Sequence, residues 1–261
     1  MDIHAASPPP TAASVAEPEW SCHVRPGLLH ALDVVCDTLA RADVEALLGG
    51  AFALARHVNR WRGTKDVDFF IRPADRDRAI SALLSVGFQD YHDQAPYDQS
   101  WIFRAHRPDA LVDVIWTLPN HVTEVDDPWF THAGHFTLRG RAYRTVPPEE
   151  LLWIKTYVMQ RDRCDWPDVI NILRVKGPDL DWSRLIERAG TDGALLHANL
   201  TLYNWIAPQQ AKRLPLWVRT KFSLPDLAEG DASDVERQRS ALLDSRPWYA
   251  ALLPVEATMS P

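Results

Sequence analysis

Two acids stand two residues apart in the stretch 66–71, DVDFFI, which otherwise has the composition of an apolar strand. Side chains alternate across a strand, so Asp66 and Asp68 would share one face. Neighbouring carboxylates repel each other, and aspartate is a poor strand former. The pair is therefore typical of a cation-binding site, and hard oxygen ligands of this kind suit Mg²⁺ or Mn²⁺.

A third acid, Asp113, lies inside another apolar stretch, ALVDVIW, at 110–116. Its neighbours on the same predicted face, Leu111 and Ile115, are apolar. Pairing of this stretch with the strand at 66–71 would explain why an acid is kept there. Asp109, which precedes the strand, is the alternative third ligand.

A glycine pair, Gly49-Gly50, follows the short apolar run 44–48 and precedes a helix predicted over 51–58. Glycine lets the backbone approach a ligand closely. The start of a helix offers free N–H groups and a positive dipole end, which favour phosphate. The end of this helix and the turn that follows it contain four cations and no acid: Arg56, Arg60, Arg62 and Lys65. These features predict a phosphate site with a basic rim beside the two acids.

Gly-Gly, a helix and then Asp-x-Asp on a strand resembles the polymerase-β-like nucleotidyltransferase superfamily. The segments LLGGAFAL and TKDVDFFI are most similar to small bacterial nucleotidyltransferases that include abortive-infection (AbiEii-like) toxins. The 15 residues between Gly50 and Asp66 form a slightly longer spacer than is usual in that family.

The resemblance implies transfer of a nucleoside monophosphate from an NTP such as ATP to an acceptor hydroxyl, with release of pyrophosphate. Asp66, Asp68 and Asp113 would be the catalytic acids and would hold Mg²⁺ or Mn²⁺. The expected nucleotide-binding residues are Gly49, Gly50, Arg62, Lys65 and Lys155.

Lys155 enters through a second part of the resemblance. Toxin-like relatives carry a helical lysine followed by Asp-x-x-Asp, and the matching residues here are Lys155, Asp165 and Asp168. Lys155 would bind the triphosphate. For Asp165 and Asp168 a capping role, at the first turn of the next helix, is equally supported.

The surrounding pattern predicts an α/β (α+β) fold, in which a mixed sheet of the nucleotidyltransferase type is flanked by helices and followed by a C-terminal helical domain. The expected division is a disordered tail at 1–24, a catalytic domain at 25–146, a helical domain at 147–245 and a second tail at 246–261. Helices are expected at 26–41, 73–86, 147–161, 166–175, 182–189, 193–206 and 233–243. A strand at 99–104, an irregular loop at 117–134 and a hairpin at 135–146 turning at Arg139-Gly140 are also expected.

Composition narrows the class of protein. The 261 residues are 46% hydrophobic and 24% charged, which is ordinary for a globular chain. The net charge of −7 argues against broad non-specific binding of nucleic acid. Three cysteines without Cys-x-x-Cys spacing argue against a zinc site or disulfide framework. No apolar run reaches the length of a membrane helix, so we expect no membrane contact and a cytoplasmic protein.

Other functions remain open from the sequence. Sugar-nucleotide glycosyltransferases also use Asp-x-Asp to hold a metal, and a non-catalytic nucleotide-sensing or protein-binding module could keep the same fold. The acceptor, whether tRNA, protein or small molecule, is not identified. A neutralising antitoxin partner is compatible with the toxin-like resemblance.

Overall fold

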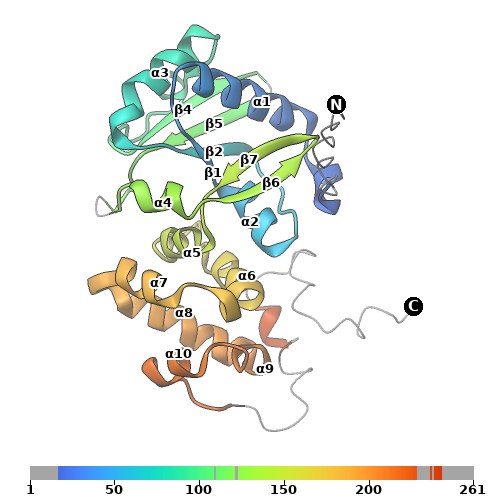
Figure 1. The fold of residues 1–261 in the computed structure, drawn as a ribbon, viewed down its shortest axis with the longest axis vertical. Helices are drawn as coiled ribbons and strands as arrows, with labels where there is room; N and C mark the ends of the chain where they lie inside the picture. Colours follow the sequence, from blue (N-terminus) through green and yellow to red (C-terminus); the bar gives the residue numbers. More distant parts are fainter. Residues whose placement is uncertain (1–16, 109, 121–122, 228–235, 237, 243–261) are drawn as a thin grey trace, which may run out of the picture.

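The computed structural model describes residues 17–108, 110–120, 123–227, 236 and 238–242. A seven-stranded sheet with the order β3-β4-β5-β2-β1-β7-β6 forms the N-terminal part (Figure 1). Its strands are β1 (Leu47–Leu48), β2 (Asp66–Phe70), β3 (Gln89–Asp90), β4 (Ile102–Arg107), β5 (Ala110–Ile115), β6 (Gly134–Leu138) and β7 (Arg141–Thr145). The pairs β2–β5 and β1–β7 are parallel and the others antiparallel, which confirms the predicted mixed sheet.

Helices α1 (Pro26–Arg41) and α3 (Arg76–Ser85) cover one face of the sheet (Figure 1). The odd-numbered side chains Val67, Phe69 and Ile71 are at most 1% exposed and share a buried cluster with these helices. The strong alternation of β2 therefore places its apolar odd positions in this layer.

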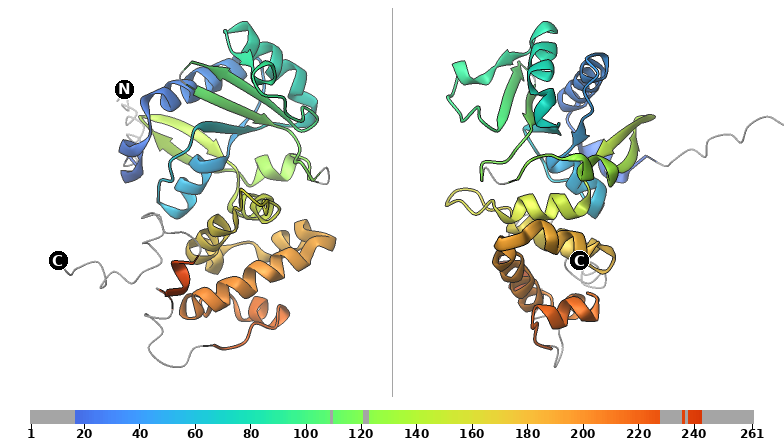
Figure 2. Two further views of the ribbon diagram at one scale, coloured as in Figure 1. Left: turned by 180° about the vertical axis from the view of Figure 1, so that it is seen from behind. Right: turned by 60° about the vertical axis from the view of Figure 1, so that its left-hand side comes forward.

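The opposite face of the sheet meets α2 (Gly50–Val58) and α5 (Pro148–Thr156). From α5 onward the described part of the chain is mostly helical. Phe70 and Ile115 share a second buried cluster with Leu151 and Ile154 of α5. The remaining helices are α6 (Trp166–Lys176), α7 (Trp182–Ala189), α8 (Gly193–Ile206), α9 (Pro208–Ala211) and α10 (Leu216–Lys221). Figure 2 shows them stacked on the same side of the sheet as α5. The even-numbered face of β2, which carries the acids, thus faces the helical part.

The predicted helix at 147–161 is too long, because α5 ends at Thr156. The chain then reverses in a narrow hairpin over 158–165. The backbone N–H of Asp165 donates to the carbonyl of Val158 at 2.9 Å, and that of Gln160 donates to Arg163 at 2.7 Å. This reversal lets α6 pack directly against α5, which a continuous helix to Arg161 would prevent.

Two further expectations are wrong in detail. The strand expected at 99–104 begins at Ile102 and runs to Arg107, because it pairs residue for residue with β5. The loop expected at 117–134 contains a short helix, α4 (Asp127–Thr131), which starts at an Asp-Pro pair suited to a first turn.

Residues 17–24, expected within a disordered tail, instead contain the 3-10 helix η1 (Glu19–His23). Trp20 is only 4% exposed. Its ring stacks on Trp61 with centroids 5.6 Å apart and also packs against Phe52 and Phe136. Burial of a large aromatic side chain is enough to order this short segment.

The remaining expected helices and the hairpin turning at Arg139-Gly140 are confirmed to within three residues; the largest difference is at Pro73–Asp75, which form a 3-10 helix before α3. Of the helix expected at 233–243, residues 236 and 238–242 are described, and 236 and 238–240 are helical. Ser233 lies outside the described residues, as do most of the two expected tails. The domain boundary at 146–147 stays a prediction. Within the described residues, no helix is both long and apolar enough to span a membrane.

Candidate active site

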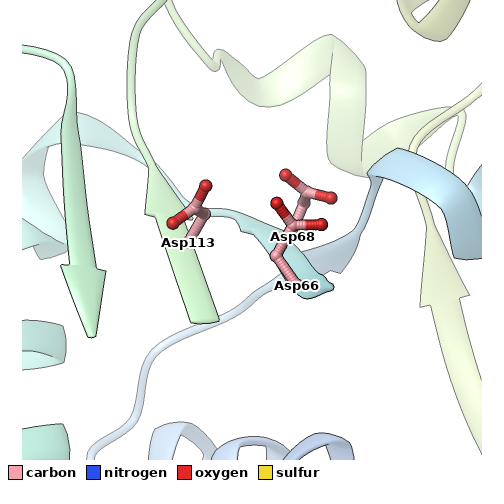
Figure 3. Close-up of side chains that lie close together, drawn as sticks. All are labelled: Asp66, Asp68 and Asp113. Carbon is pink, nitrogen blue, oxygen red and sulfur yellow. The ribbon is translucent and has the colours of Figure 1, made fainter. Parts of the chain in front are cut away.

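The three predicted acids come together on neighbouring strands. β2 and β5 are parallel and in register, so that Asp68 lies opposite Asp113 and Asp66 opposite Leu111. Alternation then places all three carboxylates on one face. Each can offer an oxygen such that the three atoms lie within 4.8 Å of one another, and Figure 3 shows the close grouping. Asp109, the alternative third acid, lies outside the described residues.

The group carries concentrated negative charge. Asp113 is 3% exposed, and Asp66 and Asp68 are partly buried. Burial, followed by repulsion from Asp66 and Asp113, raises the pKa of Asp68 to about 8. Burial also raises the pKa of Asp113 against the opposing effect of Arg104. A divalent cation would relieve this repulsion, and the all-oxygen donor set fits Mg²⁺ or Mn²⁺.

The glycine pair is required by the close approach of the acids. Gly50 has φ +50°, and a Cβ there would lie 1.7 Å from an Oδ of Asp68. A Cβ on Gly49 would lie 2.2 Å from the ring of Phe70. The N–H of Gly49 donates to the backbone carbonyl of Asp68 at 2.8 Å, and α2 starts at Gly50. The start of α2 therefore abuts the acids, as the sequence predicts.

Arg104 is a site residue that the sequence reasoning missed. It lies opposite Asp113 on the antiparallel β4, and its Nε and Nη2 donate to the two carboxylate oxygens at 2.7 and 2.6 Å. Bidentate pairs of this kind fix geometry as well as charge. The strand signal around residue 104 was visible, but the pairing depends on the register of β4 against β5.

Lys155 is buried and forms ion pairs with two acids of the protein. Its ammonium donates to Asp165 at 2.9 Å and to Asp168 at 2.7 Å, and all three side chains are at most 8% exposed. Asp165 occupies the N-cap position of α6 yet makes no side-chain cap hydrogen bond. Lys155 strongly lowers the pKa of Asp165, to about 2, against the effect of burial. The two acids therefore join α6 to α5 through Lys155.

A polar cavity of about 460 Å³ adjoins the acids and contains the predicted basic residues. It is lined by Gly50, Arg62, Gly63, Thr64, Lys65, Asp66, Asp68, Lys155 and Arg163. Nη2 of Arg62 lies 3.4 Å from Asp168, and the buried Nε of Arg62 has no hydrogen-bond partner. An unpartnered buried donor beside free backbone N–H groups suits an anionic oxygen.

Arg163, on the hairpin at 158–165, is a second residue that the sequence reasoning missed. It lines the polar cavity, its side chain is 63% exposed, and its contact with Asp165 is long at 3.4 Å. The first half of this hairpin, as far as Arg161, was expected to be helix, and that course of the chain would have placed Arg163 elsewhere.

A family model described as "Uncharacterised nucleotidyltransferase" matches residues 27–205, which include every acid and cation discussed above. The chain belongs to this nucleotidyltransferase family. Membership confirms the superfamily predicted from Gly-Gly and Asp-x-Asp, whereas the abortive-infection subtype stays a prediction. Among curated proteins, none matches the chain in sequence.

Several solved structures are similar to this nucleotidyltransferase at low identity. The antibiotic-resistance factor ANT(2'')-Ia is 16% identical, covers 75% of this chain and 92% of its own, and has a TM-score of 0.40. The lincosamide antibiotic adenylyltransferase LnuA, solved with lincomycin, is 14% identical over 57% of this chain and 96% of its own, with a TM-score of 0.42. JHP933 from Helicobacter pylori is 14% identical over 91% and 93%, with a TM-score of 0.37. Likeness at this level carries no argument about substrate.

Proposed function

We propose that this nucleotidyltransferase transfers a nucleoside monophosphate from an NTP to an acceptor hydroxyl, in a reaction that depends on Mg²⁺ or Mn²⁺ and releases pyrophosphate. The observation that carries the proposal is the gathering of Asp66, Asp68 and Asp113 within 4.8 Å beside Gly50. Divalent ions bound there would supply Lewis-acid activation and neutralise charge on the triphosphate.

The chain's own residues have distinct proposed roles. Asp66, Asp68 and Asp113 hold the cations, and Asp113 also takes the proton of the acceptor hydroxyl. The backbone at Gly49-Gly50 holds the outer phosphates through the N–H of Gly50 and those of the first turn of α2, because the N–H of Gly49 already donates to Asp68. The supporting cations are Arg62, Lys65 and Lys155. Lys155 acts on the triphosphate from within its pair of acids, so its charge contributes more than its direct hydrogen bonding.

The test is transfer of label from α-phosphate-labelled NTPs in the presence of a cell lysate. Asp66→Asn and Asp68→Asn should abolish labelling and leave the circular dichroism spectrum unchanged. The matched control is Asp77→Asn, an acid on α3 whose side chain is almost fully exposed and lies outside the site. Full labelling by either site variant would refute the assignment.

A non-catalytic nucleotide-binding module is a second candidate. The observation that favours it is the bidentate contact of Arg104 with both oxygens of Asp113. Such a module would bind NTP with Mg²⁺ but label nothing in any lysate. Calorimetric binding without turnover would therefore decide for this candidate. Family membership argues against the metal-dependent glycosyltransferase that the sequence left open.

The finer parts of the proposal rest on narrower support. A toxin-like role with an antitoxin partner is supported by the local resemblance at 44–71. A cytoplasmic location is supported by Cys22, Cys36 and Cys164, which are all free thiols. Growth arrest on expression, relieved by a neighbouring gene product, would establish the toxin role; normal growth with full transferase activity would remove it.

A further inference from the structure

A second cavity, which we call the inner cavity, meets the polar cavity at the acids. Its volume is about 310 Å³. Gly50, Asp68, Lys155 and Arg163 line both cavities, whereas Asp113 and Arg104 line only the inner one. The third acid, proposed to receive the acceptor proton, thus faces a different space from Arg62 and Lys65, two of the cations proposed to hold phosphate.

The wall of the inner cavity is mainly apolar. Phe70, Ile115 and Ile154, from β2, β5 and α5, are at most 9% exposed. Trp101 and Val158, which are half-buried, also line it. An apolar wall with a few polar groups at the reacting end is typical of small-molecule sites.

The charges on this wall are already matched. Arg104 is paired with Asp113, and Lys155 and Arg163 both contact Asp165. Phosphate-bearing ligands require cations that can replace their counterions. The polar cavity offers Lys65 and Arg62, which do not line the inner cavity. Arg163, whose contact with Asp165 is long, is shared by the two cavities. The inner cavity therefore suits an uncharged molecule.

The volume sets the size of that molecule. Liquid water occupies about 30 Å³ per molecule, so the inner cavity equals roughly ten waters. Pockets for small ligands begin at about 300 Å³. A folded RNA or a protein segment would exceed this space.

We infer that the acceptor is a small, uncharged alcohol whose apolar body fills the inner cavity, an inference that rests on the proposed nucleotidyl transfer. Its hydroxyl oxygen forms a bond to the α-phosphorus of the NTP. The bond from that phosphorus to the bridging oxygen breaks, and pyrophosphate leaves with the electron pair. The hydroxyl proton passes to Asp113, whose oxygens each keep a second lone pair while accepting from Arg104.

The first experiment measures binding of phenylpropanol, a neutral alcohol with an apolar body, to the full chain with Mg²⁺ and α,β-methylene-ATP. Saturation-transfer NMR should show contact with its ring. Val158→Trp, which fills the cavity, should reduce the effect by about fivefold or more, and phenylpropanoate should bind about fivefold more weakly. The matched control is Val86→Trp, at the half-buried end of α3. Equal signals for Val158→Trp and wild type, or preference for the carboxylate, would overturn the inference.

The second experiment locates the product. With α-phosphate-labelled NTPs and lysate, label should appear in a small-molecule fraction that reversed-phase resin retains, and Val158→Trp should remove it. Label on RNA or protein would overturn this acceptor class and leave nucleotidyl transfer intact. Affinity for α,β-methylene-ATP should change by less than about twofold in Val158→Trp; a loss equal to that of phenylpropanol would assign the inner cavity to the nucleoside. Absence of nucleotide binding in wild type would refute the proposed function itself.

Discussion

Two clusters of buried charge in this protein are balanced in different ways. Glu149 and Glu150, at the start of α5, are at most 5% exposed, and both accept hydrogen bonds from Arg184 of α7. Nε of Arg188 also lies 3.6 Å from Oε1 of Glu150. At the other cluster, the three aspartates of β2 and β5 are paired with Arg104 alone among the cations of the described residues.

The difference separates charge that supports the fold from charge available for chemistry. The glutamates are neutralised by the protein's own arginines, so that cluster needs nothing from solution. The aspartates keep an excess of negative charge, and burial together with this repulsion raises the pKa of Asp68. Such excess is costly unless a cation arrives, so the imbalance marks the site better than burial does.

The largest expected effect comes from forcing the aspartates apart. Gly50→Ala places a methyl group against Asp68 and strains a backbone with φ +50°. Nucleotidyl transfer should fall on the order of 1,000-fold, because several kcal/mol of metal-borne charge stabilisation would be lost. Gly193→Ala is the control, since its Cβ would meet nothing within 4 Å. Steady-state rates for both variants measure the effect, and near-normal activity of Gly50→Ala would contradict the described geometry.

The cluster of Glu149, Glu150 and Arg184 should affect stability rather than nucleotidyl transfer. Arg184→Met removes the cation of Glu149 and the shorter of the two arginine contacts of Glu150, so the free energy of unfolding should drop by about 3 kcal/mol or more. Urea denaturation measures this, with exposed Lys221→Met as the control. A loss below about 1 kcal/mol would mean that the cluster contributes no more than a surface ion pair.

The dependence of stability on pH should distinguish the two kinds of charge. Between about pH 4 and pH 8, the folded metal-free protein keeps a proton on Asp68 that the unfolded chain has released. This carboxyl therefore makes the free energy of unfolding fall as pH rises. Urea denaturation in EDTA should show a shallower fall for Asp68→Asn, and Mg²⁺ should flatten the wild-type curve. Identical slopes in all three conditions would show that Asp68 is not perturbed.

The contribution of Asp165 to the pH dependence of stability has the opposite sign to that of Asp68. Lys155 lowers its pKa to about 2, so its contribution is complete above about pH 4 and is lost only as pH falls through 2. Asp165→Asn should accordingly leave the slope between about pH 5 and pH 8 unchanged, which makes it the control for the Asp68 experiment.

The smallest expected effect concerns Arg163. Because its side chain is largely exposed and its contact with Asp165 is long, Arg163→Ala should leave stability unchanged within about 0.5 kcal/mol. It should raise KM for the NTP several-fold with little change in kcat, if Arg163 contacts phosphate from the rim of the polar cavity. An unchanged KM would assign phosphate binding to Arg62 and Lys65.

The strands that carry the three acids could be predicted because their signal is local. Asp66 and Asp68 are placed on one face by alternation alone, and Asp113 is noticeable as an acid inside an apolar strand. The sheet and most helices followed from the same periodicities. These features depend on residues within one element, so no knowledge of the tertiary structure was needed.

The missed features depend on distant partners. The contact of Arg104 with Asp113 requires the register of β4 against β5, and no local pattern sets that register. The end of α5 at Thr156 depends on the pairing of Lys155 with Asp165 and Asp168, which lie 10 and 13 positions further along. The apolar periodicity continues to Met159, so the sequence favoured a longer helix. The end of α5 follows from contacts that form only in the folded protein.

The stacking of Trp20 on Trp61 has a practical consequence for shortened versions of this protein. Trp61 immediately precedes Arg62 in the turn that lines the polar cavity. Deleting the first two dozen residues, as the proline-rich beginning of the chain would tempt an experimenter to do, removes the aromatic partner that steadies this turn. A trimmed protein that folds and yet handles nucleotide poorly would have lost this support, with every reacting group still in place.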